Sequence, residues 1–151
     1  MRKFQEVDKE FKKYNSSSVK LPVRSTKTAV CYDFFCPTDI ILPAQKITTV
    51  WTNVKAYFEA DEGLFLATRS SMGAKGIMLA NGIGIIESDY ADNPSNGGNL
   101  GFMFCNTTES DYALKQGEKL GQGFFSKFLT VDNEDEITAV RIGGFGSTGK
   151  E

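Results

Sequence analysis

Short apolar runs separated by turn residues dominate the chain after residue 19. These runs are rich in β-branched and aromatic residues, and Gly, Pro, Asn and Asp separate them, a pattern that is typical of β-strands. We predict strands over residues 20–24, 29–35, 46–58, 64–69, 77–86, 100–106, 124–131 and 137–142. Many short strands with frequent turns indicate an all-β domain of the sandwich, barrel or jelly-roll type.

The first 14 residues show a different pattern. Apolar and aromatic residues recur at helical spacing between charged ones, which predicts a short N-terminal helix; they are Phe4, Val7, Phe11 and Tyr14. Residues 15–18 read as a loop that ends this helix. We therefore expect one domain over residues 1–151, with a helix at 1–14, a β core at 15–140 and a flexible segment at 141–151.

Length, composition and charge suit a single soluble domain. The chain has 151 residues, of which 40% are hydrophobic, and a net charge of −2. This charge gives no electrostatic argument for a nucleic-acid or membrane partner. No apolar run is long enough to span a bilayer, and the charged N-terminus shows no signal-peptide core, so we expect a cytoplasmic protein.

The absence of histidine limits the available chemistry. The sequence contains no histidine and three cysteines without metal-ligand spacing, which excludes Ser–His triads, Cys–His pairs and His-ligated metals. An enzyme with this composition must use carboxylates, backbone amides, arginines and a hard cation such as Mg²⁺.

Residues 81–90 combine flexibility with acidic and aromatic groups. Gly82 and Gly84 allow a ligand to approach the backbone, and a carboxylate and a ring follow at Glu87 and Tyr90. The alternative is an ordinary strand that ends in a solvated acidic turn. In a straight strand Glu87 and Tyr90 face opposite sides, so one pocket that uses both requires a bend.

The glycine-rich segment 141–149 is suited to an anion. Its backbone N–H groups can converge on a phosphate, with hydroxyl donors at Ser147 and Thr148 and a guanidinium at Arg141. Phe145 has little core to join and is well placed to stack on a nucleobase. A formal GxGxxG pattern is present, but that motif requires a helix after its glycines. A disordered glycine tail is the alternative.

Two further stretches give weaker indications of phosphate binding. Arg69, Ser70 and Ser71 follow a predicted strand, and Gln122 lies in a turn that enters another. Asp33 is a lone acid among aromatic residues. It is either a buried turn residue or a group that orients metal-bound water.

Taken in order, these stretches resemble the five motifs of the trimeric dUTP pyrophosphatase (dUTPase) family. Residues 143–149 match the last motif without a change, and residues 84–90 resemble the third. The arginine–serine motif matches at residues 69–71, the first motif at Tyr32 and Asp33, and the fourth, loosely, at Gly117 and Gln122. The resemblance implies a distorted jelly-roll or β-barrel homotrimer whose sites are shared between chains.

The resemblance also implies a reaction, hydrolysis of dUTP to dUMP and pyrophosphate, which keeps uracil out of DNA. Glu87 would activate the water that attacks the α-phosphorus, and Asp33 would bind waters on Mg²⁺. Substrate would be held by Arg69, Ser70, Ser71, Asn81, Gly84, Ile86, Tyr90, Gln122, Arg141, Phe145, Gly146, Ser147 and Thr148. Of these, Tyr90 would exclude a 2′-hydroxyl, Asn81 and the backbone at 82–86 would read uracil, and the C-terminal segment would close as a lid.

Several positions depart from the family pattern. Glu87 replaces the usual aspartate, and Lys119 stands where arginine is usual. Arg141 lies one residue nearer the glycines, and the polar loop at residues 92–99 is longer than usual. This loop is a candidate surface for a protein partner. Two alternatives therefore stay open: a dUTP-sensing regulatory protein with weak catalysis, and a dCTP deaminase of the same fold.

Overall fold

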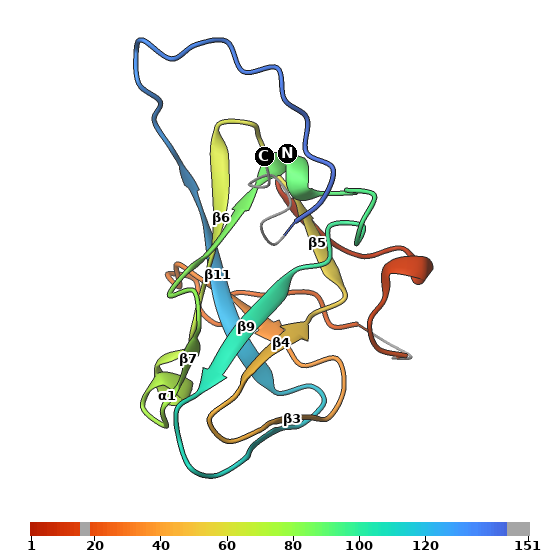
Figure 1. Ribbon diagram of the computed structural model, residues 1–151, viewed down its shortest axis with the longest axis vertical. Helices are drawn as coiled ribbons and strands as arrows, with labels where there is room; N and C mark the ends of the chain where they lie inside the picture. Colours follow the sequence, from red (N-terminus) through yellow and green to blue (C-terminus); the bar gives the residue numbers. More distant parts are fainter. Residues whose placement is uncertain (16–18, 145–151) are drawn as a thin grey trace.

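The computed structural model describes residues 1–15 and 19–144 and consists almost entirely of strands and loops (Figure 1). The elements in chain order are β1 (Lys3–Glu6), the 3-10 turn η1 (Lys9–Phe11), β2 (Tyr32–Phe35), β3 (Ile40–Leu42), β4 (Ile47–Trp51), β5 (Val54–Tyr57), β6 (Glu62–Ala67), α1 (Ser70–Gly73), β7 (Ile77–Leu79), β8 (Gly84–Glu87), the 3-10 turn η2 (Ser88–Tyr90), β9 (Gly101–Asn106), β10 (Tyr112–Leu114) and β11 (Lys119–Lys127). The predicted all-β class is confirmed.

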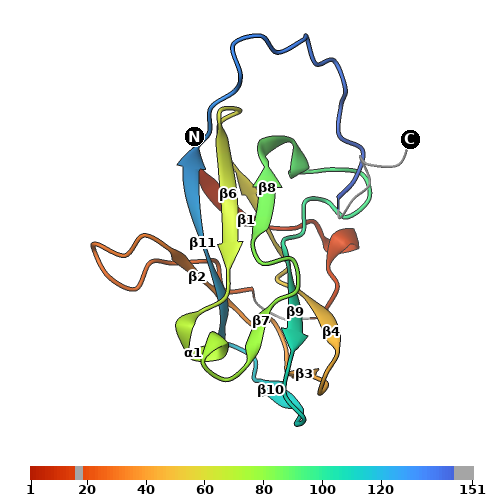
Figure 2. The same cartoon turned by 60° about the vertical axis from the view of Figure 1, so that its left-hand side comes forward.

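Two antiparallel sheets form the body of the molecule (Figure 2). The larger sheet has the strand order β2-β11-β6-β8 and the smaller has the order β4-β9-β7, while β1 pairs with β5 and β3 with β10. Strand β8 is thus an edge strand, whose outer backbone groups pair with no other strand of the described residues. This edge carries the motif at residues 84–90.

The hydrophobic core lies between these sheets. Leu64 and Leu66 of β6 point inward, and the ring of Phe34 on β2 meets that of Phe102 on β9 at 5.3 Å. The sheets approach closely at Gly121, where an added Cβ would lie 2.3 Å from the Phe102 ring. Burial of a large aromatic side chain such as Phe102 contributes about 1.5–3 kcal/mol.

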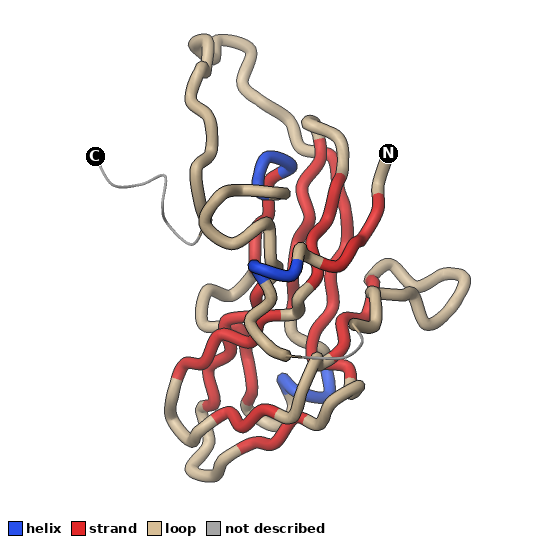
Figure 3. Tube along the Cα trace, turned by 90° about the vertical axis from the view of Figure 1, so that its right-hand side faces the viewer, coloured by secondary structure: helices blue, strands red, loops and turns tan. Residues whose placement is uncertain are grey.

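The predicted helix over residues 1–14 is wrong. The segment forms β1, antiparallel to β5 with Phe4 opposite Ala56, and then the single turn η1 (Figure 3). Phe4 packs its ring against Tyr32 and Phe125, at 5.2 and 5.5 Å. Strand pairing with β5 and this aromatic cluster stabilise the extended form, which local spacing alone does not reveal.

Some strand predictions also need correction. The predicted strand at 46–58 is two strands, separated where Asn53 takes a positive φ of 59°, and that at 77–86 is divided by a turn at Gly82 with φ 74°. Residues 20–24 contribute only an isolated bridge at Val23, and residues 137–142 form no strand. These last residues belong to the arm at 128–144, which leaves the end of β11 and arcs away from the body before it returns (Figure 1). Among the described residues, the structure contains no helix long and apolar enough to cross a membrane.

Candidate active site

The motif at residues 84–90 ends in the bend that its chemistry requires. Strand β8 stops at Glu87, and η2 turns the chain over Ser88–Tyr90. The Glu87 carboxylate is exposed, whereas the Tyr90 ring is 4% exposed. The need for a bend, which strand periodicity indicated, is therefore met by a 3-10 turn.

The returning arm contacts both of these residues. Arg141 Nη2 lies 3.0 Å from Glu87 Oε2, and Arg141 Nε donates to Asp89 Oδ1 at 2.8 Å. Gly144 packs on the Tyr90 ring so closely that a Cβ there would lie 2.3 Å from Cε2. The arm thus joins the carboxylate and the ring into one site. Phe145, Gly146, Ser147 and Thr148 lie outside the described residues.

The Tyr90 hydroxyl is held from two sides. It donates to the backbone carbonyl of Asn99 at 2.7 Å and accepts from Asn96 Nδ2 at 2.7 Å. Burial raises the pKa of this hydroxyl, while the hydrogen bond from Asn96 and the charge of Arg141 oppose the shift. Tyr90 therefore stays neutral at physiological pH.

A second group lies near the opposite end of β6. Asp33 on β2 faces Gln122 on β11, and Gln122 faces Ala67 on β6. Lys119 Nζ lies 2.7 Å from Asp33 Oδ2, and Arg69 Nε lies 3.9 Å from Asp33 Oδ1. Gln122 Nε2 donates to the Thr68 carbonyl at 3.2 Å, and Ser70 and Ser71 are exposed residues of α1. Two cations, an amide and two hydroxyls make this group suitable for phosphate.

The two groups are separated along the sheet. Glu87 pairs with Gly63, whereas Gln122 pairs with Ala67. Four residues of strand span about 13 Å, at roughly 3.3 Å each. The hairpin turn at 80–83 lies near the Ala67 end, since the Leu79 N–H donates to Thr68 Oγ1 at 3.1 Å. From the hairpin into β8 the order is therefore Asn81, Gly84, Ile86 and then Glu87, with Glu87 farthest from Arg69.

The hairpin that the sequence assigned to uracil is open. Asn81 and Gly82 are exposed, and an added Cβ at Gly82 would meet nothing within 4 Å. Gly84 is buried against Leu66, while Ile86 points into the core and leaves only its backbone for a ligand. Backbone groups on this edge strand can hydrogen-bond a flat polar ring.

Two residues that contribute to these groups were not predicted from the sequence, Lys119 and Asn96. Lys119 was noted only as a replacement for arginine, yet it pairs directly with Asp33. Asn96 lay in a loop interpreted as a candidate partner surface, yet its side chain is 7% exposed and contacts Tyr90. An asparagine-rich stretch has the same composition as any turn, so no local signal distinguished it.

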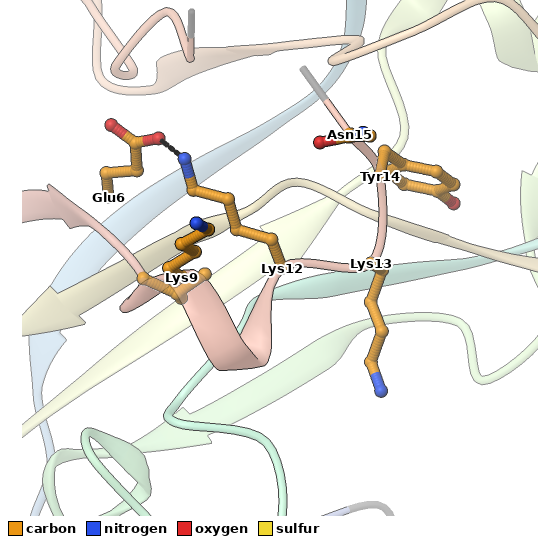
Figure 4. Close-up of a pocket in the computed structure, with 7 residues that line it drawn as sticks. Glu6, Lys9, Lys12, Lys13, Tyr14 and Asn15 are labelled. Carbon is orange, nitrogen blue, oxygen red and sulfur yellow. Dashed lines mark ion pairs between the residues drawn. The ribbon is translucent and has the colours of Figure 1, made fainter. Parts of the chain in front are cut away.

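A hollow of about 680 Å³ lies elsewhere, at the N-terminal segment (Figure 4). Its lining includes Lys9, Lys12 and Lys13. Lys12 is paired with Glu6, and Lys13 lies over the Trp51 ring at 5.6 Å. None of the predicted site residues lines this hollow, so it is not the candidate active site.

The fold and these side chains define an all-β protein with a carboxylate–tyrosine pair on a sheet edge and a separate group of side chains whose chemistry suits an anion. The chain belongs to the dUTPase family, whose model matches residues 17–149. It is 36% identical over 139 residues to the deoxyuridine 5′-triphosphate nucleotidohydrolase of Lactococcus lactis, covering 91% of this chain and 93% of that one. The protein of that name from Paramecium bursaria Chlorella virus 1 is 35% identical, covering 87% and 92%.

Solved structures are similar to this chain in the same way. The dUTPase from Streptococcus mutans superposes with a TM-score of 0.76 at 35% identity, covering 86% of this chain and 98% of that one. The dUTPase of phage phi11 of S. aureus, in which a structural Mg(II) ion is coordinated, shares the fold with a TM-score of 0.69 at 17% identity, covering 92% and 99%.

Proposed function

We propose that this chain hydrolyses dUTP to dUMP and pyrophosphate by attack of water on the α-phosphorus, with Glu87 as the general base. One observation carries the assignment of roles: Glu87 and Tyr90 lie at one turn, and the arm at 141–144 contacts both. Relatives named deoxyuridine 5′-triphosphate nucleotidohydrolase support the reaction.

The hairpin and Glu87 follow each other along the strand as uracil and the α-phosphate follow each other in dUTP, while Tyr90 lies in the turn η2 directly after Glu87. Uracil would lie at the hairpin of Asn81 and Gly84, deoxyribose on the Tyr90 ring, and the α-phosphate beside Glu87. An exposed carboxylate at that place can orient a water molecule and accept its proton. The arm would exclude bulk water when it closes on the substrate, which strengthens electrostatic interactions within the site.

This order implies that one chain does not hold a complete site. With uracil nearest Thr68, the triphosphate extends toward Glu87 and away from Arg69 and Gln122 of the same chain. Arg69, Ser70, Ser71 and Gln122 would therefore hold the triphosphate bound to another copy. A site shared between copies of the chain explains why the two groups lie apart.

An apolar stripe on the outer face of the larger sheet supports this assembly. Ile85 is 58% exposed and pairs with Phe65, whose ring stacks on that of Phe124 at 5.4 Å. The stripe lies between Glu87 and Gln122 on the same face. Exposed apolar stripes of this kind mark subunit contacts. We propose that the protein forms a homotrimer through this face.

The residues of the site suit a Mg²⁺ ion that binds together with the substrate. The described residues contain no group of three acidic, Cys or His side chains that could hold a metal. Asp33 is a single carboxylate between two cations, which suits an acceptor for metal-bound water. When bound, Mg²⁺ would neutralise charge on the phosphate oxygens. Arg69 and Lys119 would share that task and orient Asp33.

The family match and the named relatives favour hydrolysis over the dCTP deaminase alternative. The sensing role, the protein partner at residues 92–99 and the cytoplasmic location stay predictions. The buried side chains of that loop, Asn93 and Asn96, are directed at Tyr90 rather than at a partner.

The test is pyrophosphate release from purified protein with Mg²⁺, with dUTP, dTTP, dCTP and UTP measured side by side. We expect fast release from dUTP alone. Tight binding of dUTP without release would contradict the hydrolase assignment and favour the sensor. Release of ammonia from dCTP would instead indicate the deaminase.

A further inference from the structure

The loop at residues 92–99 closes on Tyr90 from two directions. Asn93 Nδ2 donates to the Tyr90 backbone carbonyl at 2.8 Å, while Asn96 Nδ2 donates to the Tyr90 hydroxyl at 2.7 Å. The hydroxyl in turn donates to the Asn99 carbonyl. Both the backbone and the far end of this side chain are therefore fixed by one loop.

Asn96 is itself held in place. Its Oδ1 accepts from Asn93 Nδ2 at 2.6 Å and from the Gly98 N–H at 3.0 Å. Asn93 and Asn96 are 3% and 7% exposed, so water competes little for these bonds. A buried asparagine that is bonded through both Oδ1 and Nδ2 has one stable orientation, because rotation of its amide leaves polar groups unpaired.

We propose that Asn96 is a positioning residue that sets the discrimination between deoxyribose and ribose. The inference rests on the proposed function, in which the sugar packs on the Tyr90 ring. A tyrosine ring whose hydroxyl is held by hydrogen bonds cannot shift to accommodate the 2′-hydroxyl of a ribose. Asn96 touches no part of the substrate and acts only through Tyr90.

The expected size of the effect follows from the bond that is lost. A typical hydrogen bond contributes about 0.5–1.5 kcal/mol, so a ring that loses the bond from Asn96 and keeps only the bond to the Asn99 carbonyl should tolerate ribose up to about tenfold better. The ratio of kcat/KM for dUTP to that for UTP should fall by that factor. The ratio of dUTP to dCTP should not change, because the hairpin at 80–83 reads the base.

Ser95→Ala is the matched control. Ser95 lies beside Asn96 and donates to Asn93 Oδ1 at 2.7 Å, whereas the Tyr90 hydroxyl bonds to Asn96 and Asn99. This variant should keep the wild-type ratio of dUTP to UTP. Thermal unfolding of each variant reports whether the loop is still folded.

A double-mutant cycle with Tyr90→Phe separates positioning from a general structural role. Phenylalanine keeps the ring and removes the hydroxyl, so Asn96→Ala should then have no further effect on the sugar ratio. If Asn96→Ala does not fold, Tyr90→Phe alone must show the loss of discrimination, since it removes the bond from Asn96 together with the bond to the Asn99 carbonyl and leaves the loop sequence unchanged.

Two results would overturn the inference: an unchanged sugar ratio in a folded Asn96→Ala protein, which includes an equal loss with dUTP and UTP, or an undiminished Asn96 effect in the Tyr90→Phe background. Failure of the proposed function is distinguishable, because the unaltered protein would then not hydrolyse dUTP at all, and the inference would fall with it.

Discussion

The guanidinium of Arg141 lies 3.0 Å from the carboxylate of Glu87, the predicted general base. The same guanidinium also binds Asp89, and its side chain is only 14% exposed. The resemblance places Arg141 among the residues that would hold substrate, whereas the structure places its guanidinium on two carboxylates. Binding of dUTP would therefore exchange carboxylate partners for phosphate ones.

Arg141→Gln tests this exchange. Loss of a charge-assisted hydrogen bond to phosphate, about 1.5 kcal/mol, should raise KM for dUTP about tenfold with little change in kcat. Steady-state kinetics measure both constants. Arg141→Lys, which keeps the charge, should show a smaller rise. A fall in kcat at constant KM would instead assign Arg141 to the orientation of Glu87.

Glu87→Gln should nearly abolish turnover. The amide keeps the shape of the side chain but cannot accept a proton, and loss of general-base catalysis costs about 10²–10⁴ in kcat. Binding of a non-hydrolysable dUTP analogue, measured by calorimetry, should be retained. Glu87→Asp keeps the carboxylate and should retain part of the activity. Near-full activity of the glutamine variant would mean that another group activates the water.

Removal of residues 143–151 should raise KM and lower kcat together, because the segment that follows Arg141 is expected to close over the substrate. Gly144→Ala is a finer version of this test. Its added methyl would lie 2.3 Å from the Tyr90 ring, so the arm or the ring must shift. Steady-state kinetics of both variants should show losses in the same direction, smaller for Gly144→Ala. Unchanged kinetics after the deletion would exclude a role for the segment.

Ile85→Glu should dissociate the proposed homotrimer, since it places a charge in the apolar stripe beside Phe65. Sedimentation velocity would report the change in mass. Ile41→Glu is the matched control, because Ile41 on β3 is 53% exposed and lies outside this sheet. A trimer that survives Ile85→Glu, or a monomeric wild type, would contradict assembly through this face.

Asp92→Asn should destabilise the fold in a pH-dependent manner. Lys55 is 3% exposed, with Nζ 2.6 Å from Asp92 Oδ1, and the Tyr57 hydroxyl donates to Asp92 Oδ2 at 2.6 Å. Burial lowers the pKa of Lys55, but its bonds to Asp92 and Tyr57 outweigh this and raise it. Burial raises the pKa of Asp92, but the same bonds lower it overall.

The sign of the pH dependence follows from these shifts. The depressed pKa of Asp92 contributes stability above its unfolded pKa of about 3.9, which is lost as the pH falls through the folded value. At pH 7 the variant should lose about 1–2 kcal/mol, since the carboxylate is half exposed and partly screened. Urea unfolding should show that the loss shrinks below pH 4. Asp39→Asn, in an exposed pair with Lys115, should change stability little. A loss that is independent of pH would contradict the ion-pair explanation.

The sequence by itself determined the class of fold and the family. Alternating apolar runs and turn residues are local properties of strands, so β2, β6 and β9 were predicted close to their observed places. The motifs at residues 69–71, 84–90 and 143–149 are also local, because each one is a contiguous segment whose residue types can be recognised directly in the sequence. These features can be recognised in the sequence without knowledge of the tertiary contacts of each segment.

Only the tertiary structure decided how these segments meet. Helical spacing in residues 1–14 was overridden by pairing of β1 with β5, and the arm at 128–144 took no strand partner. Register with β6 offset Glu87 and Gln122 by about 13 Å along the strand direction, and folding of the loop brought Asn96 onto the Tyr90 hydroxyl. Such contacts join residues far apart in the chain, and their free energy comes from pairing and burial that no local window of sequence contains.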